Sequence, residues 1–77
     1  MINKEVFDQF VGHVIRIYLY AIDKYGDQDL ISHAVGFFSY EIEKDGFITL
    51  KAGNASFYAS QSQIDFDGFD RINIVRI

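Results

Sequence analysis

One stretch of the chain, Ser39-Tyr40-Glu41-Ile42-Glu43-Lys44-Asp45-Gly46-Phe47-Ile48-Thr49-Leu50-Lys51, decides the fold. Apolar and polar residues alternate on both sides of Asp45-Gly46, as expected for two strands joined by a tight turn. A two-residue loop at Asp45-Gly46 sets Ile42 opposite Thr49 and mixes apolar with polar side chains on both faces. A three-residue loop pairs Ile42 with Ile48 and keeps the faces apart, so the sequence predicts this β-hairpin.

The turn chemistry supports that register. Three-residue hairpin loops combine a type I turn with a left-handed third residue, and Gly46 holds the third position. A second hairpin is predicted at Gly53-Asn54, where a two-residue loop pairs Leu50 with Phe57. Together the two turns predict a three-stranded meander over about residues 35 to 60. Its inner face is expected to contain Phe38, Tyr40, Ile42, Ile48, Leu50, Phe57 and Ala59.

Shorter patterns flank the meander. Residues 3 to 11 carry apolar side chains at spacings of three and four, which predicts a short helix that docks on the sheet. Residues 13 to 22 are rich in β-branched and aromatic side chains and predict a long strand. Residues 64 to 66 and 71 to 77 predict two further strands. Residues 23 to 34 are expected to form a loop that ends in a helical turn or in irregular chain.

A short helix followed by five or six short strands predicts a mainly β fold. We expect a small SH3-like or Sm-like barrel, or a strongly bent sheet of antiparallel strands. Residues 10 to 17 resemble the helix-to-strand entry of Sm-like proteins, Val35-Gly36-Phe37-Phe38 resembles the start of their second strand, and Ile72-Asn73-Ile74 resembles their closing strand. The resemblance implies an oligomer that binds RNA. However, Ile42 and Gly46 stand where that family has its RNA-binding Asp and Asn, so no site residue is carried over.

Length and composition limit the class of protein. The 77 residues are enough for a single domain, 1–77, which must be stabilised by packing because the chain contains no cysteine. The longest apolar run, Val14 to Ile22, is shorter than the ~20 residues of a membrane span. The amino terminus lacks the basic-then-apolar order of a signal peptide. We therefore expect a cytoplasmic location.

The charge pattern limits the partners. The formal net charge is −4, and the seven lysines and arginines are scattered along the chain. Because binding to phosphate backbones depends on clustered basic side chains, general nucleic-acid binding is disfavoured. A protein partner is expected instead, with a basic or nucleic-acid-binding protein as the best match.

Two surfaces are predicted to contact such a partner. In the acidic loop, Tyr25, Asp27 and Asp29 combine negative charge with an exposed tyrosine. Alternation along the strands also places three aromatic residues on the outer face of the meander, on the same side as polar residues and where water is expected. They are Phe37, Phe47 and Tyr58. Either a helix or strand covers these rings, or they contact a partner or a second copy of the chain.

No pattern predicts catalysis, a cofactor or a metal site. The segment Asp65-x-Asp67-Gly68-x-Asp70 resembles a calcium loop, but its glycine is fourth instead of sixth and the late Glu is missing. His13 is expected to be a half-buried structural side chain, and His33 has no nucleophile beside it. Glu41 and Glu43 lie beside a tight turn and are expected to be solvated.

These observations predict a small acidic protein-binding domain without catalytic activity. An inhibitor of this kind suits a phage or a mobile element, whose accessory proteins block nucleic-acid-binding host factors. The alternative is an Sm-like oligomeric module that binds RNA by aromatic stacking. Self-association into a homo-oligomer through open sheet edges is a further expectation.

Overall fold

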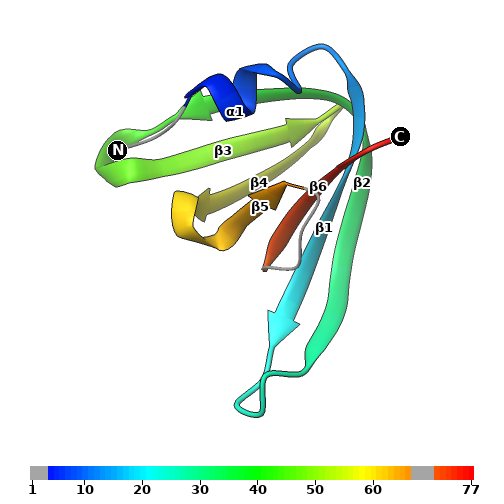
Figure 1. Cartoon of the computed structure of the whole chain (residues 1–77), viewed down its shortest axis with the longest axis vertical. Coiled ribbons are helices and arrows are strands. Elements are labelled where there is room, and N and C mark those ends of the chain that lie inside the picture. The colour runs from blue at the N-terminus through cyan, green and yellow to red at the C-terminus, as the bar shows by residue number, and fades with distance from the viewer. Residues whose placement is uncertain (1–3, 67–70) are drawn as a thin grey trace.

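The computed structural model describes residues 4–66 and 71–77, and these form one short helix, two single turns of 3₁₀ helix and six strands (Figure 1). In chain order the elements are α1 (Lys4–Asp8), β1 (Val14–Ile22), β2 (Gln28–Ile42), η1 (Lys44–Gly46), β3 (Phe47–Ala52), β4 (Ala55–Ser60), η2 (Gln61–Gln63), β5 (Ile64–Phe66) and β6 (Ile72–Arg76). The expectation of a mainly β fold is confirmed.

The strands form one six-stranded sheet in the order β4-β3-β2-β1-β6-β5. The expectation of a purely antiparallel sheet is wrong, because β5 pairs with β6 in parallel. Side-chain alternation reports which face a residue occupies and carries no information about strand direction. Closure into a barrel is not found among the described residues, since β4 pairs only with β3 and β5 only with β6. The sheet is bent and open.

Both predicted hairpins are confirmed. The three-residue loop of η1 gives the expected pairing of Ile42 with Ile48, and Gly46 has a φ of 77°. The Gly53-Asn54 turn pairs Leu50 with Phe57. Because glycine has no Cβ, Gly46 adopts its left-handed conformation without the clash that other residues meet.

The bend of the sheet is built into β2. Residues 28–37 of β2 pair with β1, and residues 38–42 pair with β3. Near the change of partner, Gly36 lies against the β3–β4 turn, where the Gly53 N–H donates a 3.1 Å hydrogen bond to the Phe37 carbonyl. A Cβ on Gly36 would lie 2.5 Å from the Gly53 nitrogen. The absence of a side chain at Gly36 therefore permits the two backbones to approach.

The core lies on the concave side of the bent sheet. It contains Phe7, Phe10, Ile15, Ile17, Phe38, Ile48, Leu50, Ala52, Ala59, Ile72 and Ile74. The expected helix is present but shorter than residues 3–11, and its Phe7 packs on Tyr40 with ring centroids 5.1 Å apart. Ile42 lies on the inner face as predicted, opposite the buried Ile48, but it is at the end of β2 and remains 40% exposed.

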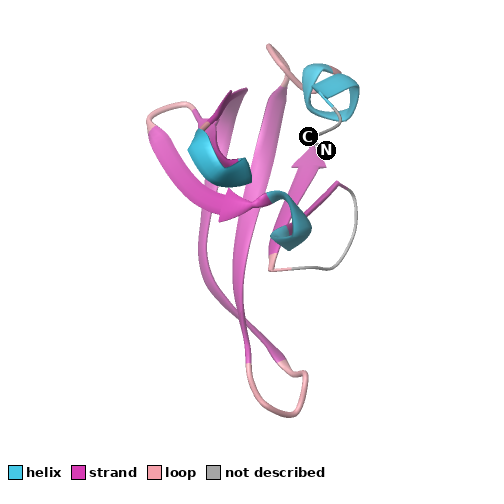
Figure 2. Cartoon of the chain, turned by 90° about the vertical axis from the view of Figure 1, so that its left-hand side faces the viewer, coloured by secondary structure: helices cyan, strands magenta, loops and turns pink. Residues whose placement is uncertain are grey.

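The expectation of a loop over residues 23 to 34 is wrong. β2 already begins at Gln28, which pairs with Ile22, and Leu30 pairs with Tyr20. Cross-strand hydrogen bonding along β1 stabilises these residues as a strand, although their local sequence favours a turn. Figures 1 and 2 show the resulting β1–β2 hairpin extending past the rest of the sheet. We call residues 21–31 of this hairpin the arm.

Candidate partner-binding surfaces

The tip of the arm is an ordered turn. The Asp23 carboxylate oxygen Oδ1 accepts hydrogen bonds from the backbone N–H of Tyr25, at 2.8 Å, and of Asp27, at 3.0 Å. Gly26 completes the turn with a φ of 83°. The Tyr25 ring projects from it with 78% of its surface exposed, and the Lys24 ammonium lies 5.1 Å from the ring centroid. Tyr25 is thus presented to solvent on a backbone that is already fixed.

The sides of the arm are apolar and exposed. β6 pairs with β1 only as far as Leu19, and β3 covers β2 only from Phe38 onward. Beyond those limits Leu30 is 51% exposed and Ile31 is 61% exposed. A register shift leaves Ile31 as an extra residue in β2, between Leu30 and Ser32. Bulges of this kind re-aim side chains and increase the local twist of the strand.

The arm brings together the three residues predicted for the acidic loop. Tyr25, Asp27 and Asp29 all lie in it and all are exposed. Sequence reasoning missed Leu30 and Ile31 as surface residues, because it assigned them to a loop. The available signal was an apolar pair directly after a run of polar residues.

The outer face of the meander separates the three predicted aromatics. Phe47 and Tyr58 stack with ring centroids 5.1 Å apart and planes 7° apart. Phe37 lies at the other end of the face, opposite Val14. Between them is a polar zone that includes the Lys51–Glu41 ion pair at 3.8 Å. Phe37 and Tyr58 are 65% and 63% exposed, so no element among the described residues covers their rings.

A second aromatic cluster lies on the outer face of β1 and β2. Tyr18 lies 6.2 Å from Tyr20 and 6.5 Å from His33, measured between ring centroids. Arg16 Nη1 donates a 3.1 Å hydrogen bond to the Tyr18 hydroxyl, and its guanidinium carbon is 5.8 Å from that ring. Arg16, Tyr18 and Tyr20 alternate along β1 and share a face in the sequence pattern, but His33 joins them only through the β1–β2 pairing, which was not predicted.

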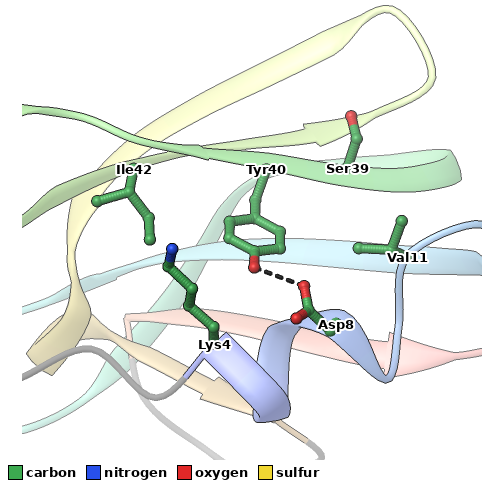
Figure 3. A pocket seen from close by; sticks show the side chains of 6 residues that line it. All are labelled: Lys4, Asp8, Val11, Ser39, Tyr40 and Ile42. Atoms are coloured by element: carbon green, nitrogen blue, oxygen red, sulfur yellow. Dashed lines mark hydrogen bonds between the residues drawn. The ribbon is translucent and has the colours of Figure 1, made fainter.

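A shallow pocket of about 430 Å³ separates α1 from the end of β2 (Figure 3). Lys4, Asp8, Val11, Ser39, Tyr40 and Ile42 line it. The Tyr40 hydroxyl donates a 2.6 Å hydrogen bond to Asp8 Oδ1, which ties the helix to the sheet. This bond is the main reason that the pKa of Tyr40 is raised above the ordinary value of 10.0; partial burial and the negative charge of Asp8 add to the effect.

The raised pKa predicts a loss of stability at alkaline pH. Because the folded protein favours the neutral phenol, the contribution of Tyr40 is present below pH 10.0 and is lost as the pH rises through the raised value. Denaturant unfolding of the wild type and of Tyr40→Phe should differ at neutral pH and converge at strongly alkaline pH. A difference that is independent of pH would contradict the assigned role of the bond.

The histidines and carboxylates singled out in the sequence can be placed in the structure in part. His13 is exposed, so the expectation of a half-buried side chain is wrong; it precedes β1 and lies outside the core. Within residues 4–66 and 71–77, no group of three His, Cys, Asp or Glu is placed to hold a metal ion. The calcium-like segment from Asp65 lies partly outside the described residues.

Comparison of the chain with protein-family models, with curated proteins and with solved structures finds no match. Across the part of the chain that the structure describes, no helix has the length and apolar character needed to span a membrane.

Proposed function

We propose that this protein is a small acidic protein-binding domain, without catalytic activity, that contacts a basic partner through the arm. The observation that supports the proposal is the composition of the arm. It exposes Tyr25, Leu30 and Ile31 beyond the edge of the core, and its polar residues include three aspartates but only one lysine. An apolar centre with a polar rim is the usual anatomy of a protein interface.

The apolar and the acidic side chains of the arm have different roles in the proposed binding. Tyr25 at the turn, with Leu30 and Ile31 further along the arm, supplies the apolar groups that are desolvated on binding, where most of the binding free energy of an interface resides. Asp27 and Asp29 steer a basic partner and raise the rate of association. The hydrogen bonds of Asp23 fix the turn in advance, which lowers the conformational entropy lost on binding.

An inhibitory role fits this chemistry. If the basic surface of the partner is its nucleic-acid-binding site, an acidic arm seated on it competes directly with phosphate. A phage or mobile element would gain from such an accessory protein acting on a host factor. A cytoplasmic location suits both partners and a chain without cysteine.

The second candidate is an Sm-like module that binds single-stranded RNA. The cluster of Tyr18, Tyr20 and His33 beside Arg16 favours it, because aromatic rings and a guanidinium can stack on bases. The net charge of −4 opposes it, since the counterion release that dominates such binding requires clustered cations.

The test is capture of basic proteins by the tagged chain. We expect the triple variant Tyr25→Ala, Asp27→Ala, Asp29→Ala to bind the captured protein at least about tenfold more weakly. That change corresponds to a loss of roughly 1.4 kcal/mol of binding free energy. The matched control is Tyr58→Ala, Glu41→Ala, Glu43→Ala, which removes the same kinds of exposed side chain from the meander and should retain it. Loss in the control with retention in the arm variant would reject the arm.

The same preparations separate the two candidates. Labelled single-stranded RNA should not bind the wild type at physiological salt if the partner is a protein. Binding that is abolished by Tyr18→Ala and unaffected by the arm variant would establish the RNA module instead.

A further inference from the structure

The two edge strands of the sheet are protected to different degrees. β5 has only three residues, and short edges are poor templates for pairing. β4 has six, Ala55-Ser56-Phe57-Tyr58-Ala59-Ser60, with no charge, no proline and a register free of shifts against β3. β3 pairs with β2 only from Phe38 onward, but the extra residue Ile31 interrupts the remainder of that side of β2. Among the described strands, β4 is therefore the regular edge that is best suited to pairing.

The direction of each backbone group in β4 follows from the neighbouring pairs. The Glu43 N–H bonds to the Phe47 carbonyl, and the Gly53 N–H bonds to the Phe37 carbonyl. Because bonding direction alternates along a strand, residues 47, 49, 51 and 53 bond toward β2, and residues 48, 50 and 52 bond toward β4. Their partners in β4 are residues 59, 57 and 55. Ser56, Tyr58 and Ser60 thus direct their N–H and C=O groups away from the sheet.

One of these outward groups is already engaged. The Ser60 N–H donates a 3.1 Å hydrogen bond to Gln63 Oε1 in η2, which caps the end of the edge. Within residues 4–66 and 71–77, no comparable hydrogen bond caps the outward groups of Ser56 and Tyr58. Two donors and two acceptors, spaced two residues apart, are left along the centre of the strand.

We propose that two copies of the chain pair through β4 in an antiparallel, two-fold symmetric dimer, with Ser56 opposite Tyr58 of the second copy. In this register each Ser56–Tyr58 pair exchanges two hydrogen bonds, so all four donors and four acceptors of the two edges are used. Phe57 then lies opposite its own counterpart on the axis. An isologous contact of this kind closes at two copies and leaves the arms free.

The side chains suit this register. Directly opposed residues of an antiparallel pair lie on the same face, so Tyr58 of one copy lies across from Ser56, the neighbour of Lys51. The half-buried Phe57 rings meet on the core side and shield each other from water. Since β4 carries no charge, two chains of net charge −4 meet here without opposing like charges on the paired strands.

The first test is sedimentation equilibrium of the wild type and two variants. Ser56→Pro removes an outward N–H without removing a bond to β3, and proline is tolerated at the free side of an edge strand. We expect the wild type to be a dimer, Ser56→Pro to be a monomer, and Ser56→Ala, which retains the N–H, to remain a dimer. A wild type that is monomeric at every concentration, or a folded Ser56→Pro that still dimerises, would overturn the proposal.

The second test does not depend on the proline variant folding. The natural chain has no cysteine, so single cysteines report contacts without background. On oxidation, Phe57→Cys should form a covalent dimer in high yield, because opposed residues on the axis have Cβ atoms about 4.5 to 5.5 Å apart. Tyr58→Cys should crosslink at least about tenfold more slowly, because position 58 of the second copy is two residues along the strand from the directly opposed position. Faster crosslinking of Tyr58→Cys, or none by Phe57→Cys, would overturn this register.

Discussion

Gly36→Ala is expected to be the most damaging glycine-to-alanine change among the glycines that the structure describes. The added Cβ would lie 2.5 Å from the Gly53 nitrogen, 2.8 Å from the Ala52 carbonyl carbon and 2.8 Å from the Gly53 Cα. All three are backbone atoms, which cannot turn aside as a flexible side chain can. Relief requires β2 to move away from the β3–β4 turn, which also breaks the 3.1 Å bond between Gly53 and Phe37.

We expect Gly36→Ala to lower the free energy of unfolding by about 3 kcal/mol or more, the upper range for overpacked sites. The total free energy of unfolding of a 77-residue domain is roughly 4 to 12 kcal/mol, so this substitution removes a large part of its stability. The measurement is denaturant unfolding. Gly46→Ala is the control, because Gly46 has a φ of 77° but open space around it, and should cost only about 1 to 2 kcal/mol. Equal costs at the two positions would contradict the close approach.

The second large effect is expected from Phe38→Ala. Phe38 is 1% exposed and packs against Phe10 and Tyr40, with ring centroids at 6.4 Å and 6.0 Å. Truncation leaves a cavity at the place where the helix segment meets the sheet. Large-to-small changes of a buried phenylalanine cost about 3 to 5 kcal/mol, which is comparable with the whole stability of so small a domain.

Its neighbour Phe37 supplies the matched control. The same substitution, Phe37→Ala, removes a side chain that is 65% exposed and should change the free energy of unfolding by no more than about 0.5 kcal/mol. Unfolding of both variants under the same conditions therefore tests which side of β2 faces the core. A larger loss for Phe37→Ala than for Phe38→Ala would mean that β2 is displaced by one residue.

The meander could be predicted because two local rules agree there. Parity sets which residues share a face, and the glycines at positions 46 and 53 fix the loop lengths, so only one register satisfies both. No such agreement exists at residues 28–34. Their strand pairing with β1 depends on contacts distant from the turn, and the polar sequence around Asp27 favours a loop.

The candidate site could be predicted only in part, because composition indicates which residues are exposed but not how they are arranged. Composition pointed to Tyr25, Asp27 and Asp29, and the structure leaves these side chains in solvent. Composition could not indicate that they belong to a projecting hairpin, which also exposes Leu30 and Ile31. Likewise, alternation along the strands placed Phe37, Phe47 and Tyr58 on one face, and the structure adds that Phe47 stacks on Tyr58 whereas Phe37 is separate from them.

The most direct test of the account is photocrosslinking from the tip of the arm. A benzophenone-bearing phenylalanine in place of Tyr25 should crosslink, in cells, to one basic protein that is identified by mass spectrometry. The same probe in place of Tyr18 should not capture that protein. Absence of a protein crosslink at position 25, with RNA captured from position 18, would contradict the assignment of the arm as the binding surface.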